Sequence, residues 1–330
     1  MPESSSGSVI DWLLRSDEPA IRYKARMWLL DQPETDAAVR RDRKEAWEGP
    51  IVSTLLDLEA AANVHPYRKW WGLHWRLVSL ADFALPVERD DVRATMDTGI
   101  NRELTWITNP RHIAAITKHD DGLYRADASM EGNALYAASR FGYANDKRTR
   151  LVVTNLLEWQ WPDGGWNCNG GSSGYRSSFH ESWATAIGLA AYHEAVGGAG
   201  DLGADAHAAA RRTAELLLEH RLFRALKTGK PVHPSWVALH WPAYWHYDFL
   251  AGLRVLKAVD PALLTDPRAA DALDLLESKQ RPDGCFQPGG TWWQAPTTAT
   301  SPVEAVDWGK GRPSEVLTLQ ALTVLKAAGR

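Results

Sequence analysis

The chain has 330 residues, 37 basic and 41 acidic side chains and a formal net charge of −4, so its electrostatics give no reason to expect nucleic acid or an anionic membrane as a partner. No apolar stretch is long enough to span a bilayer, the opening MPESSSGSVIDWLL has neither a basic nor an apolar leader region, and two cysteines are too few for a disulfide framework. We therefore expect a cytoplasmic, reduced protein without an integral membrane segment, and the sequence sets no oligomeric state.

Helical periodicity runs along almost the whole chain, and alternating strand patterns are rare. Residues 18–31 carry a proline near the front and apolar residues at helical spacing, which predicts a helix that begins near Ser16 or Asp17. The fold class that follows is all-α. Further helices are predicted, in chain order, at 35–47, 49–60, 67–84, 88–108, 130–143, 146–160, 178–196, 204–223, 242–258, 266–280 and 313–328.

Two kinds of predicted helix alternate along the chain. RRTAELLLEH (211–220) and AADALDLLESK (269–279) each have a charged side, whereas WATAIGLAAY (183–192) and VLTLQALTVL (316–325) are apolar nearly all round. A helix that is apolar on every side has to be enclosed by other elements. The alternation therefore indicates two concentric layers, with solvent-facing helices outside and enclosed helices inside.

A short string recurs at the ends of three predicted helices. DGLY (121–124), DGGW (163–166) and DGCF (283–286) each precede a loop and another helix. Asp-Gly favours a tight turn because glycine accepts positive φ and aspartate bonds its own backbone. The aromatic residue that closes each string would then fill the gap between neighbouring helices. These strings indicate a repeated pair of helices.

The longer strings QWPDGGW (160–166) and QRPDGCF (280–286) resemble the QW repeat of squalene–hopene and oxidosqualene cyclases, and the same helix-pair unit is similar to the β subunits of protein prenyltransferases. The strings DGGWNC, SSFHESW, HRLFRALKTGK and WHYDFLAGL further resemble a group of small bacterial squalene-cyclase-like repeat proteins. The resemblance implies a single α/α toroid of paired inner and outer helices. Residues 1–64 would form additional N-terminal helices that pack on the toroid of residues 65–330.

Two motifs of these enzymes are missing from the sequence. There is no Asp-x-Asp-Asp, with which squalene–hopene-type cyclases protonate their substrate, and Asp90-Asp91 is not followed by the rest of a DDxxD magnesium motif. The chain is also about half the length of the two-domain triterpene cyclases. Without the Asp-x-Asp-Asp motif, triterpene cyclisation through a central acid is not expected. A shared fold alone does not determine the chemistry.

The resemblance also predicts where polar groups meet, because the inner helices of such a toroid begin at one rim. Polar residues that precede or open inner helices are expected to converge there. They are Asp127 and Glu131, then Cys168, His180 and Glu181, then His240, His246 and Asp248, and finally Asp307 and Glu315.

Zinc is the metal that these residue types suggest, with Cys168, His180 and His246 as ligands and an open fourth position. Protein prenyltransferases hold zinc through Asp, Cys and His at their rim, with an Asp-x-Cys triplet at a DG turn. The local match is Asp283-Gly284-Cys285, but no histidine follows it, so Cys168 is preferred. His240, Asp248 and Cys285 stay open as residues that complete the site.

Each of these residues also has a structural interpretation. Free cysteine is among the most buried residue types, and a histidine at a helix start can bond a backbone carbonyl. His246 and Asp248 could equally form an imidazole–carboxylate pair that orients a ligand.

General acids and bases are expected from the carboxylates, and substrate contacts from the aromatic residues, since the chain holds 17 tryptophans. The candidate catalytic residues are Asp248, Glu181, Asp127 and Glu131, and the candidate substrate-binding residues are Trp183, Trp241, Trp245 and Tyr247.

Three functions remain open on this basis. The first is a zinc-assisted enzyme in the toroid cavity that acts on a small hydrophobic, isoprenoid- or terpene-like substrate by cyclisation, lyase or transfer chemistry. The second is a metal-free enzyme, either a divergent terpene cyclase or a carbohydrate-active enzyme with a pair of carboxylates. The third is a non-catalytic binding protein on the same fold.

Overall fold

The computed structural model describes residues 6–171, 174–198, 200–294 and 303–330, and within these ranges the chain forms helices and isolated bridges but no β-strand. The all-α fold class is therefore confirmed. The helices are α1 (Ser6–Leu14), α2 (Pro19–Lys24) with the π-helical turn η1 (Ala25–Leu29), α3 (Ala37–Glu45), α4 (Pro50–Leu56), α5 (Leu73–Phe83), α6 (Asp90–Ile107), α7 (Pro110–Ala115), α8 (Ala128–Arg140), α9 (Lys147–Trp159), α10 (Phe179–Ala195), α11 (Gly200–Glu219), α12 (Phe249–Val259), α13 (Ala270–Ser278) and α14 (Glu315–Ala327).

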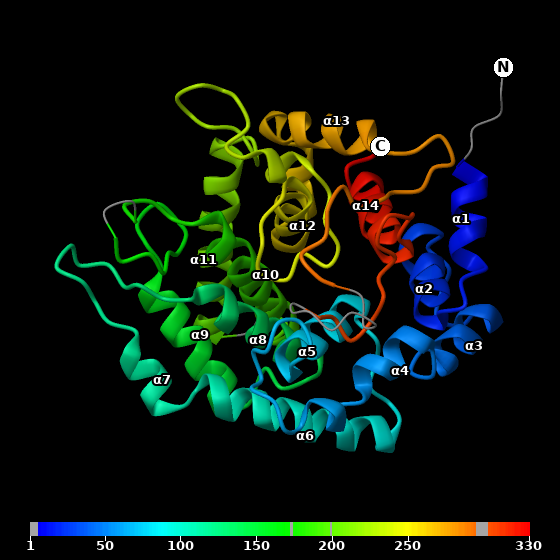
Figure 1. The fold of residues 1–330 in the computed structure, drawn as a ribbon, viewed down its shortest axis with the longest axis horizontal. Helices are drawn as coiled ribbons and strands as arrows, with labels where there is room; N and C mark the ends of the chain where they lie inside the picture. The colour runs from blue at the N-terminus through cyan, green and yellow to red at the C-terminus, as the bar shows by residue number, and fades with distance from the viewer. Residues whose placement is uncertain (1–5, 172–173, 199, 295–302) are drawn as a thin grey trace.

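The helices form two concentric layers, as Figure 1 shows. The inner helices α5, α8, α10, α12 and α14 contact one another in that order, and α2 packs between α14 and α5 to close the ring. Of the outer helices, α6 covers α5 and α8, α9 covers α8, α11 covers α10 and α12, and α13 covers α12 and α14. This arrangement is a single α/α toroid.

Hydrophobic patterning explains which helix lies in which layer. Every residue of α10 from Glu181 to Tyr192 is buried, because this helix is surrounded by α8, α11 and α12. In α11, by contrast, Ala210 and Leu217 are buried while Arg211 is exposed. An apolar stripe on one face places a helix outside, and apolar residues all round place it inside.

The three Asp-Gly strings fold into the same turn. In each, the glycine has positive φ and its amide donates to the carbonyl three residues earlier, at 2.8–2.9 Å in Gly122, Gly164 and Gly284. In the second and third turns a glutamine side chain, from Gln160 or Gln280, donates to the glycine carbonyl. The closing aromatic residues of these two turns, Trp166 and Phe286, are fully buried between helices.

Several helix boundaries differ from the prediction. α5 begins at Leu73 instead of residue 67, because the chain passes so close to itself that a Cβ on Gly72 would lie 2.1 Å from the carbonyl oxygen of Pro66. α12 begins at Phe249 instead of residue 242, because the Asp248 side chain caps the helix there by accepting the amide of Ala251. The short helices α1 and α7 were not predicted.

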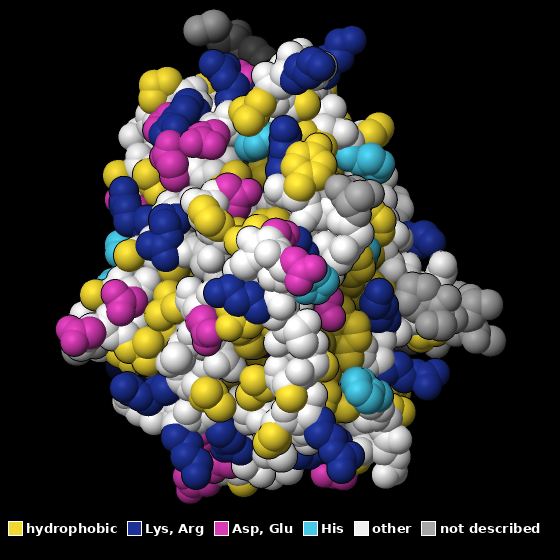
Figure 2. Space-filling model, turned by 90° about the vertical axis from the view of Figure 1, so that its left-hand side faces the viewer, with side chains coloured by type: hydrophobic (Ala, Val, Ile, Leu, Met, Phe, Trp, Pro, Cys, Tyr) yellow, Lys and Arg dark blue, Asp and Glu magenta, His cyan; other side chains and the backbone are white. Residues whose placement is uncertain are grey.

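The N-terminal helices belong to the same body as the ring. Ser16 donates to the carboxylate of Glu315 in α14 at 2.7 Å, and the buried Glu18 accepts the amides of Ala20, Ile51 and Val52. Acidic and basic side chains are interspersed over the face that carries α7 and α9 (Figure 2). In the described part of the chain, no helix has the length and apolar character needed to cross a membrane.

Candidate metal centre

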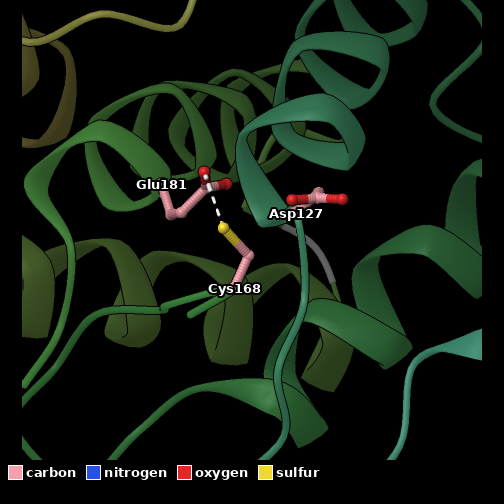
Figure 3. A group of neighbouring side chains, drawn as sticks. All are labelled: Asp127, Cys168 and Glu181. Carbon is pink, nitrogen blue, oxygen red and sulfur yellow. Dashed lines mark hydrogen bonds between the residues drawn. The ribbon is translucent and has the colours of Figure 1, made fainter. Parts of the chain in front are cut away.

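Three of the predicted rim residues meet where α8 and α10 begin. Asp127 lies at the start of α8, Cys168 lies in the loop after the second Asp-Gly turn, and Glu181 lies in the first turn of α10. One ligand atom of each lies within 4.8 Å of the other two. Figure 3 shows the Cys168 thiol pointing toward Glu181, to which it donates at 3.6 Å, with Asp127 beside them. Among the described residues, no other group of three such side chains is this compact.

Two glycines bring these side chains together. A Cβ on Gly132 would lie 2.4 Å from Cα of Thr185, and one on Gly188 would lie 2.3 Å from the carbonyl oxygen of Gly132. The backbones of α8 and α10 can therefore touch only because both positions lack a side chain. Thr185 fastens the contact by donating to the carbonyl of Ala128 at 2.8 Å.

Backbone hydrogen bonds then fix the two loops that carry the site. The amide of Ala126 donates to the carbonyl of Asn167, and the amide of Ser129 at the start of α8 donates to the Glu181 carboxylate at 2.9 Å. Glu181 is therefore held by the N-terminus of the neighbouring helix, which favours a negative charge there. The thiol of Cys168, one residue beyond Asn167, is placed against this carboxylate.

The surroundings of Glu181 and Cys168 disfavour their ionised forms. Burial and, to a smaller extent, the charges of Asp127 and Glu131 raise the pKa of Glu181 to about 7, against the lowering by the hydrogen bond from Ser129. Burial, followed by the charges of Glu181 and Asp127, raises the pKa of the Cys168 thiol well above its ordinary value. A cation between these side chains would reverse this repulsion, because all three donors are then favoured in their ionised form.

Glu131 and His112 form a second polar pair one helical turn from Asp127. The Nε2 of His112 lies 2.8 Å from Oε1 of Glu131, while Oε2 of Glu131 is buried without a hydrogen-bond partner in the described structure. Burial raises the pKa of Glu131, and the hydrogen bond to Glu131 raises the pKa of His112. His112 was not among the predicted site residues.

Tyr67 is another residue that the sequence did not single out. Burial raises the pKa of its hydroxyl, and so do the nearby charges of Glu181, Asp127 and Cys168. Its ring contacts Trp75 at 5.0 Å and lies 6.3 Å from Trp106. No local motif marks Tyr67 or His112; only their position in the loops around the same rim could have indicated them.

His180 and His246, the other predicted zinc ligands, are not brought to Cys168. The Nδ1 of His180 accepts the amide of Tyr247 at 2.9 Å. The ring of His246 is stacked between Trp245 and Trp292, with centroids 4.0 Å away on each side. Burial lowers the pKa of His180 to about 4 and that of His246 to about 3, so both imidazoles are neutral, and His180 meets the rings of Trp245 and His246 edge-on. The ligand set Cys168, His180 and His246 is therefore not assembled.

Asp248 and His240 form a separate pair at the start of α12. One oxygen of Asp248 accepts the amide of His240 at 3.0 Å and lies 3.2 Å from its Nδ1, while the other accepts the amide of Ala251 at 2.9 Å. Both oxygens of Asp248 are thus engaged in capping the helix and holding His240. This geometry gives Asp248 a structural task, and its role as a general acid or base stays a prediction.

The remaining rim residues lie away from the cluster, near α14. Asp307, Glu315 and Cys285 line a groove of about 660 Å³ together with Asp283 and Arg312. Glu315 is occupied by Ser16, and burial raises the pKa of Cys285 to about 11.

The predicted substrate-binding aromatic residues divide into two kinds. Tyr247 is fully buried and donates to the carbonyl of Leu222 at 2.6 Å, so it belongs to the core. Trp241 is buried beside Arg254. Trp183 instead lines a small cavity in the ring, and its indole N–H donates to the backbone carbonyl of Trp245. The side chain of Trp245 is half-buried.

Comparisons with known proteins add little to this geometry. No protein-family model and no curated protein matches the sequence. Among solved structures, the chain is similar to the type II terpene cyclase MstE from Scytonema in its apo form, with 16% identity, a TM-score of 0.31 and coverage of 84% of this chain and 96% of that chain. A TM-score this low does not establish a shared fold or a shared function.

Proposed function

We propose that the protein is a zinc-dependent enzyme that acts on a small hydrophobic molecule at the rim of the toroid, with Asp127, Cys168 and Glu181 as the metal ligands. The observation that carries the proposal is the convergence of these three side chains, from three separate segments, within 4.8 Å. Two of the three were expected as catalytic acids and one as a ligand. The proposal therefore replaces His180 and His246 by the two carboxylates.

The donor set fits zinc in its chemistry. One thiolate and two carboxylates combine the sulfur and oxygen ligands that zinc accepts, and three protein ligands leave a fourth tetrahedral position for a substrate. Asp127 and Cys168 are exposed whereas Glu181 is buried, so the open position would face solvent. When bound, Zn²⁺ supplies a Lewis acid that polarises a carbonyl or hydroxyl oxygen.

The neighbouring residues are suited to hold and move a proton. His112 keeps its proton more firmly than a free imidazole because it is hydrogen-bonded to Glu131 at 2.8 Å. Being half-buried, His112 can deliver that proton to a bound substrate and recover it from solvent. The Tyr67 hydroxyl stays protonated near these carboxylates and can donate a hydrogen bond to a substrate oxygen.

The aromatic residues beside the cluster support a hydrophobic substrate. Tyr67 contacts Trp75 and His74 and lies near Trp106, and Trp106 lies near His112, so rings border the same side of the site as the polar groups. Such a wall would bury an apolar substrate and stabilise a cationic centre by cation–π attraction. Cyclisation, lyase and transfer reactions of an isoprenoid-like molecule all suit it.

Elemental analysis of protein purified without chelators tests the metal assignment. About one zinc per chain is expected in wild type and in the matched control Cys285→Ser, and near-complete loss in Cys168→Ser and Asp127→Asn. His180→Ala and His246→Ala should retain the metal. Zinc lost from the two histidine variants but kept in Asp127→Asn would overturn the carboxylate ligand set, and a wild-type protein without zinc would overturn the metal centre.

The activity is tested by turnover of a panel of apolar alcohols, aldehydes and epoxides, followed by mass spectrometry of the products. Removal of zinc should abolish turnover and its return should restore it, while Tyr67→Phe should lower kcat with little change in metal content. Turnover that is indifferent to zinc removal would contradict a role for the metal in the reaction.

A metal-free acid is the second candidate, and the raised pKa of Glu181 is the observation that favours it. A carboxyl with a pKa of about 7 is protonated in a useful fraction of molecules near neutrality and can act as a general acid. This is the chemistry that a divergent terpene cyclase or a carbohydrate-active enzyme would need. Activity that survives in Cys168→Ser but disappears in Glu181→Gln would favour this candidate over the zinc enzyme.

A further inference from the structure

A second polar cavity lies at the opposite end of the ring, where the inner helices end. It has a volume of about 400 Å³ and its walls come from η1, α5, α8, α10, α12 and α14. Glu194 near the end of α10 lines it, whereas Glu181 at the start of the same helix belongs to the proposed metal centre. Thirteen residues of α-helix separate these two carboxylates by about 20 Å, so the two sites are independent.

Basic side chains dominate this cavity. Arg140, Arg254 and Lys257 line it, against the two carboxylates of Asp82 and Glu194. Arg254 donates to Asp82 at 2.5 Å and Arg140 donates to Glu194 at 2.8 Å, so each carboxylate already has one guanidinium partner. The lining therefore carries one cation more than its acids neutralise.

Lys257 is the basic residue of the cavity lining that has no carboxylate partner among the described residues. Its ammonium lies 5.7 Å from the ring of Trp28, and within the described ranges it has neither a hydrogen bond nor an ion pair. A second lysine, Lys24, lies on the same tryptophan ring at 5.0 Å and is nearly buried. Lys24 donates to the carbonyl of Ala84 at the end of α5, and no carboxylate pairs with it in the described structure. Two lysine side chains thus share one aromatic ring at the edge of the cavity, and burial lowers the pKa of Lys24 to about 7.

The guanidinium groups also keep donors in reserve. Nε of Arg140 is buried without a hydrogen-bond partner in the described residues, and Arg254 uses one of its nitrogens on Asp82. A guanidinium has five N–H donors and an ammonium has three. Burial and, after it, the charges of Arg254 and Arg140 lower the pKa of Lys257 to about 8, and an anion in the cavity would relieve the repulsion from the arginines.

We propose that this cavity binds the phosphate group of a phosphorylated small molecule, with Lys257, Arg140 and Arg254 as the contacting residues and Lys24 as the supporting charge. A phosphate monoester is a dianion near neutral pH, and its charge would hold Lys257 and Lys24, which lack carboxylate partners in the described structure, in their protonated form. Its three terminal oxygens can accept donors from several directions, and the walls of this cavity offer such donors. A carboxylate has one charge and two oxygens, so it matches less well.

Isothermal titration calorimetry of the full chain with inorganic phosphate tests this proposal, with acetate as the comparison anion. Saturable phosphate binding is expected, and Lys257→Met should weaken it about tenfold because a charge-assisted hydrogen bond is lost. Lys227→Met removes the same charge from an exposed loop position and should leave binding unchanged. Glu194→Gln removes an exposed acid that competes for Arg140 and should tighten binding.

Each contrary outcome counts against the site. Absence of saturable binding overturns the proposal, and so does equal binding by wild type and Lys257→Met. Acetate that binds as tightly as phosphate overturns the assignment of a dianion. Because none of these variants touches Asp127, Cys168 or Glu181, zinc content measured on the same samples separates failure of this site from failure of the proposed function.

Discussion

At the scale of single residues, the carboxyl of Glu181 governs the chemistry of the rim. It accepts the thiol of Cys168 and the amide of Ser129, and it lies among the charges of Asp127 and Glu131. Burial raises its pKa from 4.5 to about 7, so in the folded, metal-free chain this carboxyl is mostly protonated below about pH 7. This preference makes the stability of the metal-free protein depend on pH.

The sign of that dependence is fixed by the direction of the shift. Glu181 stabilises the metal-free fold fully below about pH 4.5, and its contribution is lost as the pH rises through about 7. The loss is about 3 kcal/mol, from a shift of roughly 2.5 pKa units at 1.36 kcal/mol each. Urea unfolding of chelator-treated wild type and Glu181→Gln between pH 4.5 and 8 should show the two free energies of unfolding diverging by this amount. Parallel curves would contradict the raised pKa.

Asp248 leads to a prediction of a different kind, because its oxygens are occupied in capping α12. Asp248→Ala should lower the free energy of unfolding by about 2 kcal/mol through loss of the cap and of the bond to His240. Asp248→Asn should recover most of this stability, since asparagine caps helices about as well. Urea unfolding measures both variants, and their zinc content should not change. A fully stable but inactive Asp248→Asn would instead restore this residue to the catalytic group.

At the scale of elements, the contact between α8 and α10 sets the geometry of the candidate site. Gly132→Ala would place a methyl group 2.4 Å from Cα of Thr185, and backbone on both sides cannot move aside cheaply. We expect a loss of about 3 kcal/mol in thermal or urea unfolding, together with weaker zinc binding as Asp127 and Glu181 move apart.

Gly203→Ala is the matched control, because the new methyl group would come close to a side-chain methyl of Val196 at 2.9 Å, while the nearest backbone atom, in Gly198, lies 3.7 Å away. It should stay within about 1 kcal/mol of wild type, since alanine also favours the helix. Equal stability of Gly132→Ala and Gly203→Ala would show that the close contact of α8 and α10 is not required.

The elements were also what the sequence predicted best. Period and apolar content placed the helices that became α8, α9, α10 and α14 within a few residues of their bounds, and alternation of the two kinds of helix predicted the layers. Boundaries failed where long-range contacts decide, as at Gly72, whose approach to Pro66 keeps residues 67–72 out of α5. The short helices α1 and α7 carry too little periodicity to be recognised.

For the candidate site, the sequence predicted which residues lie at the rim of the toroid, but not which of them lie next to one another. Asp127, Cys168 and Glu181 were each chosen because they precede or open an inner helix, and they do converge. The choice of His180 over the carboxylates failed to match the geometry because a residue's neighbour in sequence points elsewhere on a helix: Glu181 faces Cys168 while His180 faces Tyr247. Their catalytic and metal-binding roles stay predictions.

At the scale of the whole molecule, the N-terminal helices close the ring. α2 lies between α14 and α5, Ser16 binds Glu315, and Lys326 of α14 donates to the carbonyls of Trp28 and Leu29. The described part of residues 1–64 therefore packs on the toroid of residues 65–330 as part of one body. Removal of residues 1–64 exposes buried apolar surface on α5 and α14, and the remaining chain should lose cooperative unfolding.

Circular dichroism melting and size-exclusion chromatography of residues 65–330 measure this effect. We expect a broad or absent transition and aggregation. A monomer that melts cooperatively within a few degrees of the full chain would show that the toroid stands without its N-terminal helices.

A metal centre with one thiolate predicts a characteristic absorption spectrum for the chain after zinc is replaced by Co²⁺. A thiolate bound to cobalt gives a charge-transfer band in the near ultraviolet, and a four-coordinate ion gives strong visible bands. We predict both bands in wild type and in Cys285→Ser, and loss of the charge-transfer band in Cys168→Ser. Cobalt that binds without the charge-transfer band, or a band that persists in Cys168→Ser, would contradict the Asp127–Cys168–Glu181 centre.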